Sequence, residues 1–274
     1  MIDTKLIASD LDDTLLDSST KLSDENIAAL RKCAEKGIHV VLCSGRIESS
    51  IMQFVRQLNI SETKFGKYII ATNGCTIFDT QTQKHIFVNK LSPEILIRAD
   101  ELAREAGLSS QVYSADTIYY DNITPWMQMN INICKVNSKK VDDYKSFLQK
   151  GSPKMLIACN PKTPQIVQGL MQKMKAEFAG KAEVFTSKPF FLEVLPLGCG
   201  KGQALEWLCN HLGISMKNAM GFGDGMNDET MIRLCGHGVA MKNADDYLKS
   251  VADYVTDFDN NESGVGRFIE KYVL

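Results

Sequence analysis

The sequence predicts an α/β fold: a doubly wound, mostly parallel, Rossmann-like sheet core with a smaller α+β domain inserted into it. At both ends of the chain short apolar runs alternate with longer amphipathic ones, and this order produces parallel strands with right-handed crossovers. In the middle, several strands follow one another beside helices, as in α+β modules. The length of 274 residues also exceeds the usual size of one domain. We expect the core domain in residues 1–83 and 189–274 and the inserted domain in residues 84–188.

The first part of the chain alternates strand and helix. Residues 5–8 are a short apolar run that predicts a buried strand. Residues 23–37 predict a helix, because Ser23 can cap its start and Gly37 can end it in a left-handed conformation. A strand at residues 40–43, a helix at 48–58 and a strand at 68–71 follow.

The middle of the chain departs from this alternation. A helix is expected from Pro93 to Gly107, since proline suits the first turn of a helix and glycine its end. Runs of β-formers joined by a short polar turn predict paired strands at residues 111–113 and 117–120. Strands at 155–159, 182–186 and 191–194 should surround a helix near 165–178. Alternation resumes after about residue 189, with a helix at 201–212, a strand at 219–223, a helix at 228–235 and a strand at 238–240.

Composition and charge exclude several classes of partner. The formal net charge is −2 and the basic residues are scattered, so the basic patch of a nucleic-acid-binding protein is missing. No apolar run approaches the ~18 residues of a membrane span, and the N-terminus lacks the apolar stretch of a signal peptide. The eight cysteines form no C-x-x-C pair and are expected to be buried free thiols, which fit a reducing compartment. We expect a cytoplasmic protein without nucleic-acid or membrane partners, and its oligomeric state stays open.

Polar groups follow four of the predicted core strands. Ligands of open α/β sheets bind at the carboxyl ends of the strands, so these groups should meet in space. Two of them are dense in carboxylates, and so many like charges at one edge destabilise the fold unless a cation neutralises them. Oxygen ligands without a His/Cys cluster indicate a hard divalent ion, Mg²⁺. The groups are Asp10-Leu11-Asp12-Asp13-Thr14, Ser44-Gly45-Arg46, Thr72-Asn73-Gly74 and Asp224-Gly225-Met226-Asn227-Asp228.

Each of these groups is weak support for a site when taken alone. An isolated D-x-D is more often a solvated turn, and a Ser-Gly-Arg sequence is usually an ordinary strand-to-helix turn. Lys201 is unusual because it opens a predicted helix, where a cation opposes the positive helix end; an anion bound there would remove that penalty. Only the expected co-location of all these groups indicates a functional site.

The motifs, in this order, resemble those of the haloacid dehalogenase superfamily of phosphatases, in its Cof-like (type IIB) branch. Residues 10–15, DLDDTL, resemble the first motif, D-x-D-G-T. Ser44-Gly45-Arg46 resembles the second motif and Lys201-Gly202 the third. GDGMNDETM, residues 223–231, resembles the fourth and is the most specific of them. The four motifs span nearly the whole chain, whereas the middle region matches only in size and position, as an inserted α+β cap of the C2 type.

Two departures from the family pattern are visible. Asp13 stands where the family most often has Gly, and it adds a negative charge beside the site. Cys199-Gly200 replaces the Val-Ser that usually precedes the lysine, which can alter the loop that carries Lys201. Neither departure removes a residue that the chemistry requires.

The resemblance implies a Mg²⁺-dependent phosphatase in which Asp10 is the nucleophile and forms an aspartyl-phosphate. Asp12 would protonate the leaving oxygen and then deprotonate the attacking water. Asp10, the backbone carbonyl of Asp12, and Asp224 would be the metal ligands. The expected substrate is a small phosphorylated metabolite, such as a sugar phosphate, and the sequence does not identify which one.

The resemblance also implies a phosphate pocket. Ser44 and the amide of Gly45 would hold phosphate oxygens, Lys201 would offset the developing charge, and Asn227 would complete the pocket. Asp228 is expected to orient Lys201 or a metal-bound water. A structural and a functional role stay equally open for three further residues: Arg46, Asn73 and Gly74.

Two other functions stay open. Phosphohexomutases share the fold but pass the phosphoryl group to a sugar instead of water, and a test with a bisphosphate activator would separate the two. A non-catalytic protein could keep Mg²⁺ or a phosphorylated ligand for binding alone. Both Asp10 and Asp12 are present, which argues against this second alternative, because a retired site could lose either of them.

Overall fold

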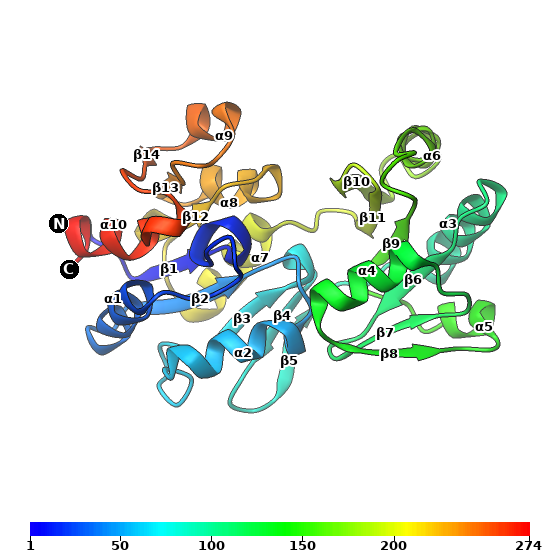
Figure 1. Ribbon diagram of the computed structural model, residues 1–274. Coiled ribbons are helices and arrows are strands. Elements are labelled where there is room, and N and C mark those ends of the chain that lie inside the picture. The colour runs from blue at the N-terminus through cyan, green and yellow to red at the C-terminus, as the bar shows by residue number, and fades with distance from the viewer. The chain divides into compact units, whose positions relative to one another are not determined.

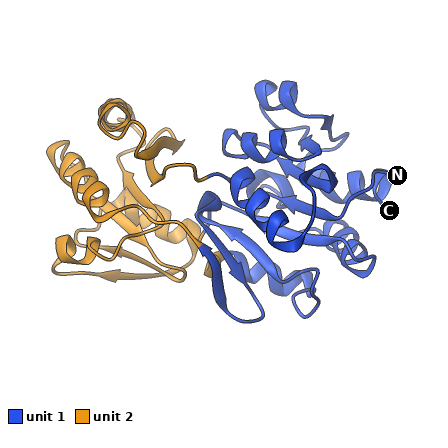
Figure 2. Cartoon of the chain, turned by 180° about the vertical axis from the view of Figure 1, so that it is seen from behind, with its two compact units in different colours: residues 1–46, 51–87, 200–274 blue, residues 47–50, 88–199 orange.

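The computed structural model describes all 274 residues, and the chain forms two compact units (Figure 2). Unit 1 consists of residues 1–46, 51–87 and 200–274, and unit 2 of residues 47–50 and 88–199. Each unit contains its own sheet and its own hydrophobic core. The predicted fold class, an α/β core with an inserted α+β domain, is confirmed.

Unit 1 is built on an eight-stranded sheet in the order β14-β13-β12-β1-β2-β3-β4-β5 (Figure 1). The strands from β14 to β3 run parallel, and β4 pairs with β3 in the antiparallel direction. The chain proceeds outward from β1 in one direction and later from β12 in the other, so a topological switch point lies between these two strands. The strands are β1 (Leu6–Ser9), β2 (His39–Cys43), β3 (Tyr68–Ala71), β4 (Thr76–Asp79), β5 (Lys84–Val88), β12 (Ala219–Gly223), β13 (His237–Ala240) and β14 (Tyr254–Val255).

Helices bury both faces of this sheet, which explains why its central strands are apolar without interruption. Ile7 packs into a cluster with residues of α1 and α10, whereas Leu6 and Ala8 pack with residues of α7 on the other side. This alternation follows from the two-residue period of a strand. The helices of unit 1 are α1 (Asp24–Glu35), α2 (Glu48–Leu58, whose first turn lies in unit 2), α7 (Lys201–Leu212), α8 (Glu229–Leu234), α9 (Asp246–Val251) and α10 (Gly264–Tyr272).

The ends of the helices follow the local signals of the sequence. The Ser23 hydroxyl accepts a hydrogen bond from the backbone N–H of Asn26 at 3.2 Å and caps α1, as predicted. Helix α7 begins at Lys201 and ends at Leu212. Gly213 caps its C-terminus in the left-handed conformation, with φ +69°.

Unit 2 is built on a six-stranded sheet in the order β10-β11-β9-β6-β7-β8. All neighbouring strands are antiparallel except β7 and β8. Helices α3 and α6 pack on one side of this sheet and α4 on the other. The strands are β6 (Ser110–Tyr113), β7 (Thr117–Tyr120), β8 (Asn137–Lys140), β9 (Met155–Ala158), β10 (Ala182–Lys188) and β11 (Phe191–Pro196), and the helices are α3 (Pro93–Glu105), α4 (Pro125–Cys134), α5 (Tyr144–Leu148) and α6 (Gln165–Glu177).

The second boundary between the units lies further along the chain than the boundary expected after residue 188. Strand β11 pairs with β9 and β10 in the sheet of unit 2, so the chain returns to unit 1 only at Gly200. At the first boundary the difference is smaller, because β5 extends the sheet of unit 1 as far as residue 87. No helix combines the length and the apolar composition that crossing a bilayer requires.

Candidate active site

The carboxyl ends of four adjacent strands, β12, β1, β2 and β3, lie side by side at one edge of the unit 1 sheet. Asp224 follows β12, Asp10 follows β1, Ser44 follows β2 and Thr72 follows β3. The polar groups identified in the sequence are therefore brought together by strand order alone. Their neighbourhood is the switch point of the sheet, where open α/β folds bind ligands.

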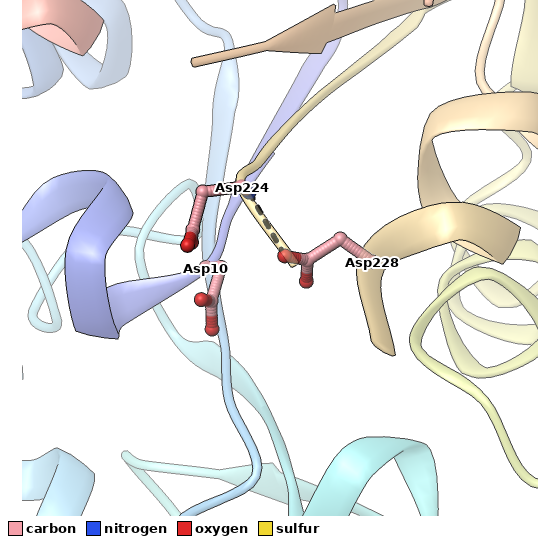
Figure 3. Close-up of side chains that lie close together, drawn as sticks. All are labelled: Asp10, Asp224 and Asp228. Carbon is pink, nitrogen blue, oxygen red and sulfur yellow. Dashed lines mark hydrogen bonds between the residues drawn. The ribbon is translucent and has the colours of Figure 1, made fainter. Parts of the chain in front are cut away.

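Three carboxylates converge at this edge (Figure 3). Asp10, Asp224 and Asp228 each offer one oxygen, and these oxygens lie within 4.8 Å of one another. The side chains of Asp10 and Asp228 are buried, at 8% and 0% exposure. Like charges this close repel one another in a low dielectric, so the arrangement requires neighbouring positive charge.

Lys201 supplies part of that charge. Its Nζ donates to Oδ1 of Asp10 and to Oδ1 of Asp228, both at 2.6 Å, and the side chain is completely buried. Burial by itself would lower the pKa of the ammonium group, but the charges of Asp10 and Asp228 outweigh this effect and raise it. Lys201 therefore stays protonated and joins the two carboxylates.

One lysine does not balance all the negative charge of the cluster. Burial raises the pKa of Asp10 well above its ordinary range, with Lys201 opposing the shift and the charges of Asp228 and Asp224 adding to it. Burial also raises the pKa of Asp224 to about 7, against the hydrogen bond from Thr14. Two raised carboxyl pKa values beside oxygen-only donors fit a site for a hard divalent cation, whose charge would keep both groups ionised.

Asp228 is engaged through both of its carboxylate oxygens. Oδ1 accepts from Lys201, and Oδ2 accepts from the backbone N–H groups of Asp224 and Gly225 at 3.0 and 3.1 Å. The second pair of bonds closes the loop after β12 and aims Asp224 at the site. This bonding fits the predicted orienting role better than that of a direct metal ligand.

The segment after β1 turns sharply and separates the side chains of Asp10 and Asp12. Asp12 has extended backbone angles, and Asp13 lies in the left-handed region with φ +58°. Gly adopts this conformation without strain, and Asp is one of the few other residues that tolerate it. The carboxylate of Asp12 points to Arg46 rather than to the group of three carboxylates.

Thr14 belongs to the site, although sequence reasoning assigned it no role. Its hydroxyl donates to Oδ1 of Asp224 at 2.6 Å and joins the segment after β1 to the segment after β12. The signal that could have identified it is its fixed place, two residues after Asp12 in the first motif.

The segments after β2 and β3 hold each other through their backbones. The N–H of Asn73 donates to the carbonyl of Ser44 at 3.0 Å, and the N–H of Thr72 donates to the carbonyl of Arg46 at 2.9 Å. Thr72, Asn73 and Gly74 all have positive φ, which is a strained conformation for a β-branched residue such as Thr72. The buried Thr72 hydroxyl has no hydrogen-bond partner.

Asn227 and Asn73 connect the segment after β12 to the segment after β3. Nδ2 of the exposed Asn227 donates to Oδ1 of Asn73 at 3.3 Å. The Asn73 side chain also lies against Gly45, where an added Cβ would come within 2.9 Å of Asn73 Oδ1. The structure thus brings every predicted site residue to this edge, with the Asp12 carboxylate on its Arg46 side.

Gly74 lies against the residue before Lys201 and so helps to fix the position of Lys201 at the start of α7. A Cβ on Gly74, whose φ is +91°, would lie 2.2 Å from the carbonyl oxygen of Gly200. Only glycine allows the segment after β3 to touch the chain at the start of α7. Gly74 therefore has a structural role that supports the position of Lys201.

Comparison with known proteins identifies the family. Residues 7–269 match the family model of the haloacid dehalogenase-like hydrolases. Over 285 residues the chain is 30% identical to 5-amino-6-(5-phospho-D-ribitylamino)uracil phosphatase YcsE of Bacillus subtilis, with 100% of this chain and 97% of the relative covered. It is 28% identical to the HMP-PP phosphatase of Serratia proteamaculans, with 90% and 87% covered.

A solved structure agrees with this match. The crystal structure of a haloacid dehalogenase-like hydrolase from Bacteroides thetaiotaomicron superposes with a TM-score of 0.89 at 32% identity, covering 98% of this chain and 99% of that one. The family match and the structural match both extend over nearly all of the chain. The chain therefore belongs to the haloacid dehalogenase-like hydrolases and is a phosphatase of their Cof-like branch.

Proposed function

We propose that this phosphatase is a Mg²⁺-dependent phosphomonoester hydrolase that acts on small phosphorylated metabolites, sugar phosphates or similar compounds, through an aspartyl-phosphate on Asp10. One observation carries the proposal: Nζ of Lys201 lies 2.6 Å from both Asp10 and Asp228, in a cluster of three carboxylates that includes Asp224. A buried carboxylate held by a lysine beside further acidic ligands is what attack on a phosphate requires.

The residues that would hold Mg²⁺ are the carboxylates of Asp10 and Asp224 and the backbone carbonyl of Asp12. The raised pKa values of Asp10 and Asp224 support this assignment, because burial and the neighbouring carboxylates disfavour the ionised forms more than Lys201 stabilises them, and a cation would restore them. When bound, the ion supplies the positive charge that lets a carboxylate and a phosphate dianion approach each other.

In the first step the Asp10 carboxylate attacks phosphorus, and the bond between phosphorus and the leaving oxygen breaks. Asp12 gives its proton to that oxygen, so the product leaves as an alcohol. The Ser44 hydroxyl and the Gly45 amide would donate to the phosphate oxygens, and Lys201 would offset the charge that develops on them. Asn227 would contact the phosphate from the end of β12.

In the second step a water molecule attacks the aspartyl-phosphate. Asp12, now ionised, accepts a proton from this water as the new phosphorus–oxygen bond forms. The bond between Asp10 and phosphorus breaks, which releases inorganic phosphate and restores the Asp10 carboxylate. One carboxyl group thus acts first as an acid and then as a base.

The substrate class rests on the relatives. One is named for a phosphorylated ribitylaminouracil and another for HMP-PP, and both are small phosphorylated molecules. We extend this class, not either compound, to the present chain. All eight cysteines are free thiols, which fits action in a reducing compartment such as the cytoplasm.

The test is phosphate release from a panel of phosphorylated metabolites, with Mg²⁺ and again with EDTA. Wild type should release phosphate only with the metal, and Asp10→Asn should release none while keeping its circular dichroism spectrum. Asp257→Asn, an exposed substitution, is the matched control and should behave as wild type. Substantial turnover by folded Asp10→Asn would refute the nucleophile. Activity that appears only with a bisphosphate activator would indicate transfer to a sugar.

A further inference from the structure

Arg46 binds the carboxylate of Asp12 through two hydrogen bonds. Its Nε donates to Oδ2 at 2.8 Å and its Nη2 donates to Oδ1 at 2.5 Å. A guanidinium that binds both oxygens fixes the plane as well as the place of the carboxylate. The Asp12 side chain is 46% exposed, so without this contact it would be free to take up other rotamers.

Arg46 is itself held from several sides. Its side chain is only 10% exposed, and its guanidinium lies over the ring of Phe54, 5.5 Å from the centroid. Its backbone N–H donates to the Ser44 hydroxyl at 3.2 Å, and its carbonyl accepts from Thr72 at 2.9 Å. An arginine fixed in this way can impose its own position on Asp12.

We propose that Arg46 is a positioning residue, which holds the Asp12 carboxylate in place for proton transfer and takes its own position from its contacts with Phe54, Ser44 and Thr72. The proposal rests on the proposed function, in which Asp12 exchanges a proton with the leaving group. Arg46 acts through Asp12 and has no assigned contact with the phosphate. The proposal assigns Arg46 a functional role.

The test compares two probes that differ in their need for a proton. The leaving group of 4-nitrophenyl phosphate departs readily as an anion, whereas that of phenyl phosphate needs proton donation. Arg46→Ala should lower kcat/KM for phenyl phosphate at least about tenfold more than kcat/KM for 4-nitrophenyl phosphate, because kcat/KM reports the step in which the leaving group departs and only the poorer leaving group needs the proton from Asp12. Arg46→Lys keeps the positive charge but cannot donate to both oxygens of Asp12 in one plane, so it should show the same larger loss for phenyl phosphate. This variant serves as the test if Arg46→Ala does not fold.

One further variant completes the comparison. Arg31 donates to the carbonyls of Leu58 and Gln57 at the other end of α2, so Arg31→Ala is the control for general loosening of this helix. It should leave the ratio of the two kcat/KM values at the wild-type value.

Failure of this proposal differs visibly from failure of the proposed function. Equal losses of kcat/KM on both probes in the Arg46 variants would show that Arg46 does not act through the acid role of Asp12, while wild-type turnover would still stand. Absence of Mg²⁺-dependent turnover of both probes by wild type would instead remove the proposed function, and this inference with it.

Discussion

Lys154 and Glu193 form an ion pair inside unit 2. Their charged atoms are 2.8 Å apart and both side chains are buried, at 7% and 4% exposure. Lys154 Nζ also lies over the ring of Tyr113, 5.3 Å from its centroid. Each charge offsets much of the free-energy cost of burying the other.

Removal of one partner should therefore destabilise the protein strongly. We expect Glu193→Gln to cost about 3–5 kcal/mol of the folding free energy of unit 2, because it leaves the lysine charge buried without its counterion. Thermal denaturation followed by circular dichroism measures the change. The exposed pair Lys271–Asp257 is the control, and Asp257→Asn should leave the melting temperature as it is. A wild-type melting temperature for Glu193→Gln would contradict the assignment.

The raised pKa of Asp224 predicts how the metal-free protein responds to pH. The group ionises at about 7 when folded and near 3.8 when unfolded, so between these values the folded state holds a proton that the unfolded state has lost. Stability should thus fall as pH rises from 4 to 7, by on the order of 2–4 kcal/mol. Melting in EDTA over this range measures it. Added Mg²⁺ should raise the melting temperature more at pH 8 than at pH 5, and Asp224→Asn should flatten the dependence. A metal-free protein that becomes more stable toward pH 7 would refute this sign.

At the scale of elements, the segment after β3 and the start of α7 are in such close contact that there is no room for a side chain at Gly74. Gly74→Ala would drive a Cβ into the Gly200 carbonyl and displace Lys201. We expect a loss of activity of about 100-fold, since a shift of one ångström at a catalytic group has effects of that order. Phosphate release and thermal melting are the measurements.

Gly213→Ala is the matched control for this prediction. Gly213 also has a positive φ, +69°, but nothing lies within 4 Å of an added Cβ. This variant should lose only about 1–2 kcal/mol of stability from backbone strain and keep its activity. Equal activity losses in the two variants would show that strain, rather than the contact with Gly200, determines the effect.

Elements with strong local signals were predictable from the sequence. The helix at 48–58 and the strands at 68–71 and 219–223 have the predicted bounds. Helix α4 was not predicted, because its apolar residues show little amphipathic periodicity. Strand β8 is fully exposed, so burial leaves no pattern in its sequence. Strand β11 was predicted but placed with the core, since apolar residues alone do not reveal which sheet a strand joins.

The site was predictable only as far as strand order fixes it. Residues that end adjacent parallel strands must meet, so the expected meeting of Asp10, Ser44 and Asp224 needed no side-chain information. The pairing of Asp12 with Arg46 and the bond from Thr14 to Asp224 depend on the left-handed turn at Asp13. Nothing in the sequence except the atypical residue itself marks that turn.

On the scale of the whole molecule, unit 2 is nearly one continuous segment whose ends lie close together. Asn89 Nδ2 is 3.4 Å from Sγ of Cys199, near the two points where the chain crosses between the units. A fragment of residues 88–199 should therefore fold alone, with a cooperative thermal transition by circular dichroism. It should melt below the full-length protein, because it lacks Ile47, which fills part of its core. A fragment without a cooperative transition would contradict the independence of unit 2.

The place of β1 between β2 and β12 has a consequence for the growing chain on the ribosome. Asp10 emerges 191 residues before Lys201, and Asp224 and Asp228 follow later still. At typical rates of synthesis this delay is roughly 10 to 40 s. Until then β1 lacks one neighbour and its aspartate lacks the lysine, so a nascent chain has no means of catalysis. The site is complete only when β12 and the loop after it have been translated and β12 has paired with β1.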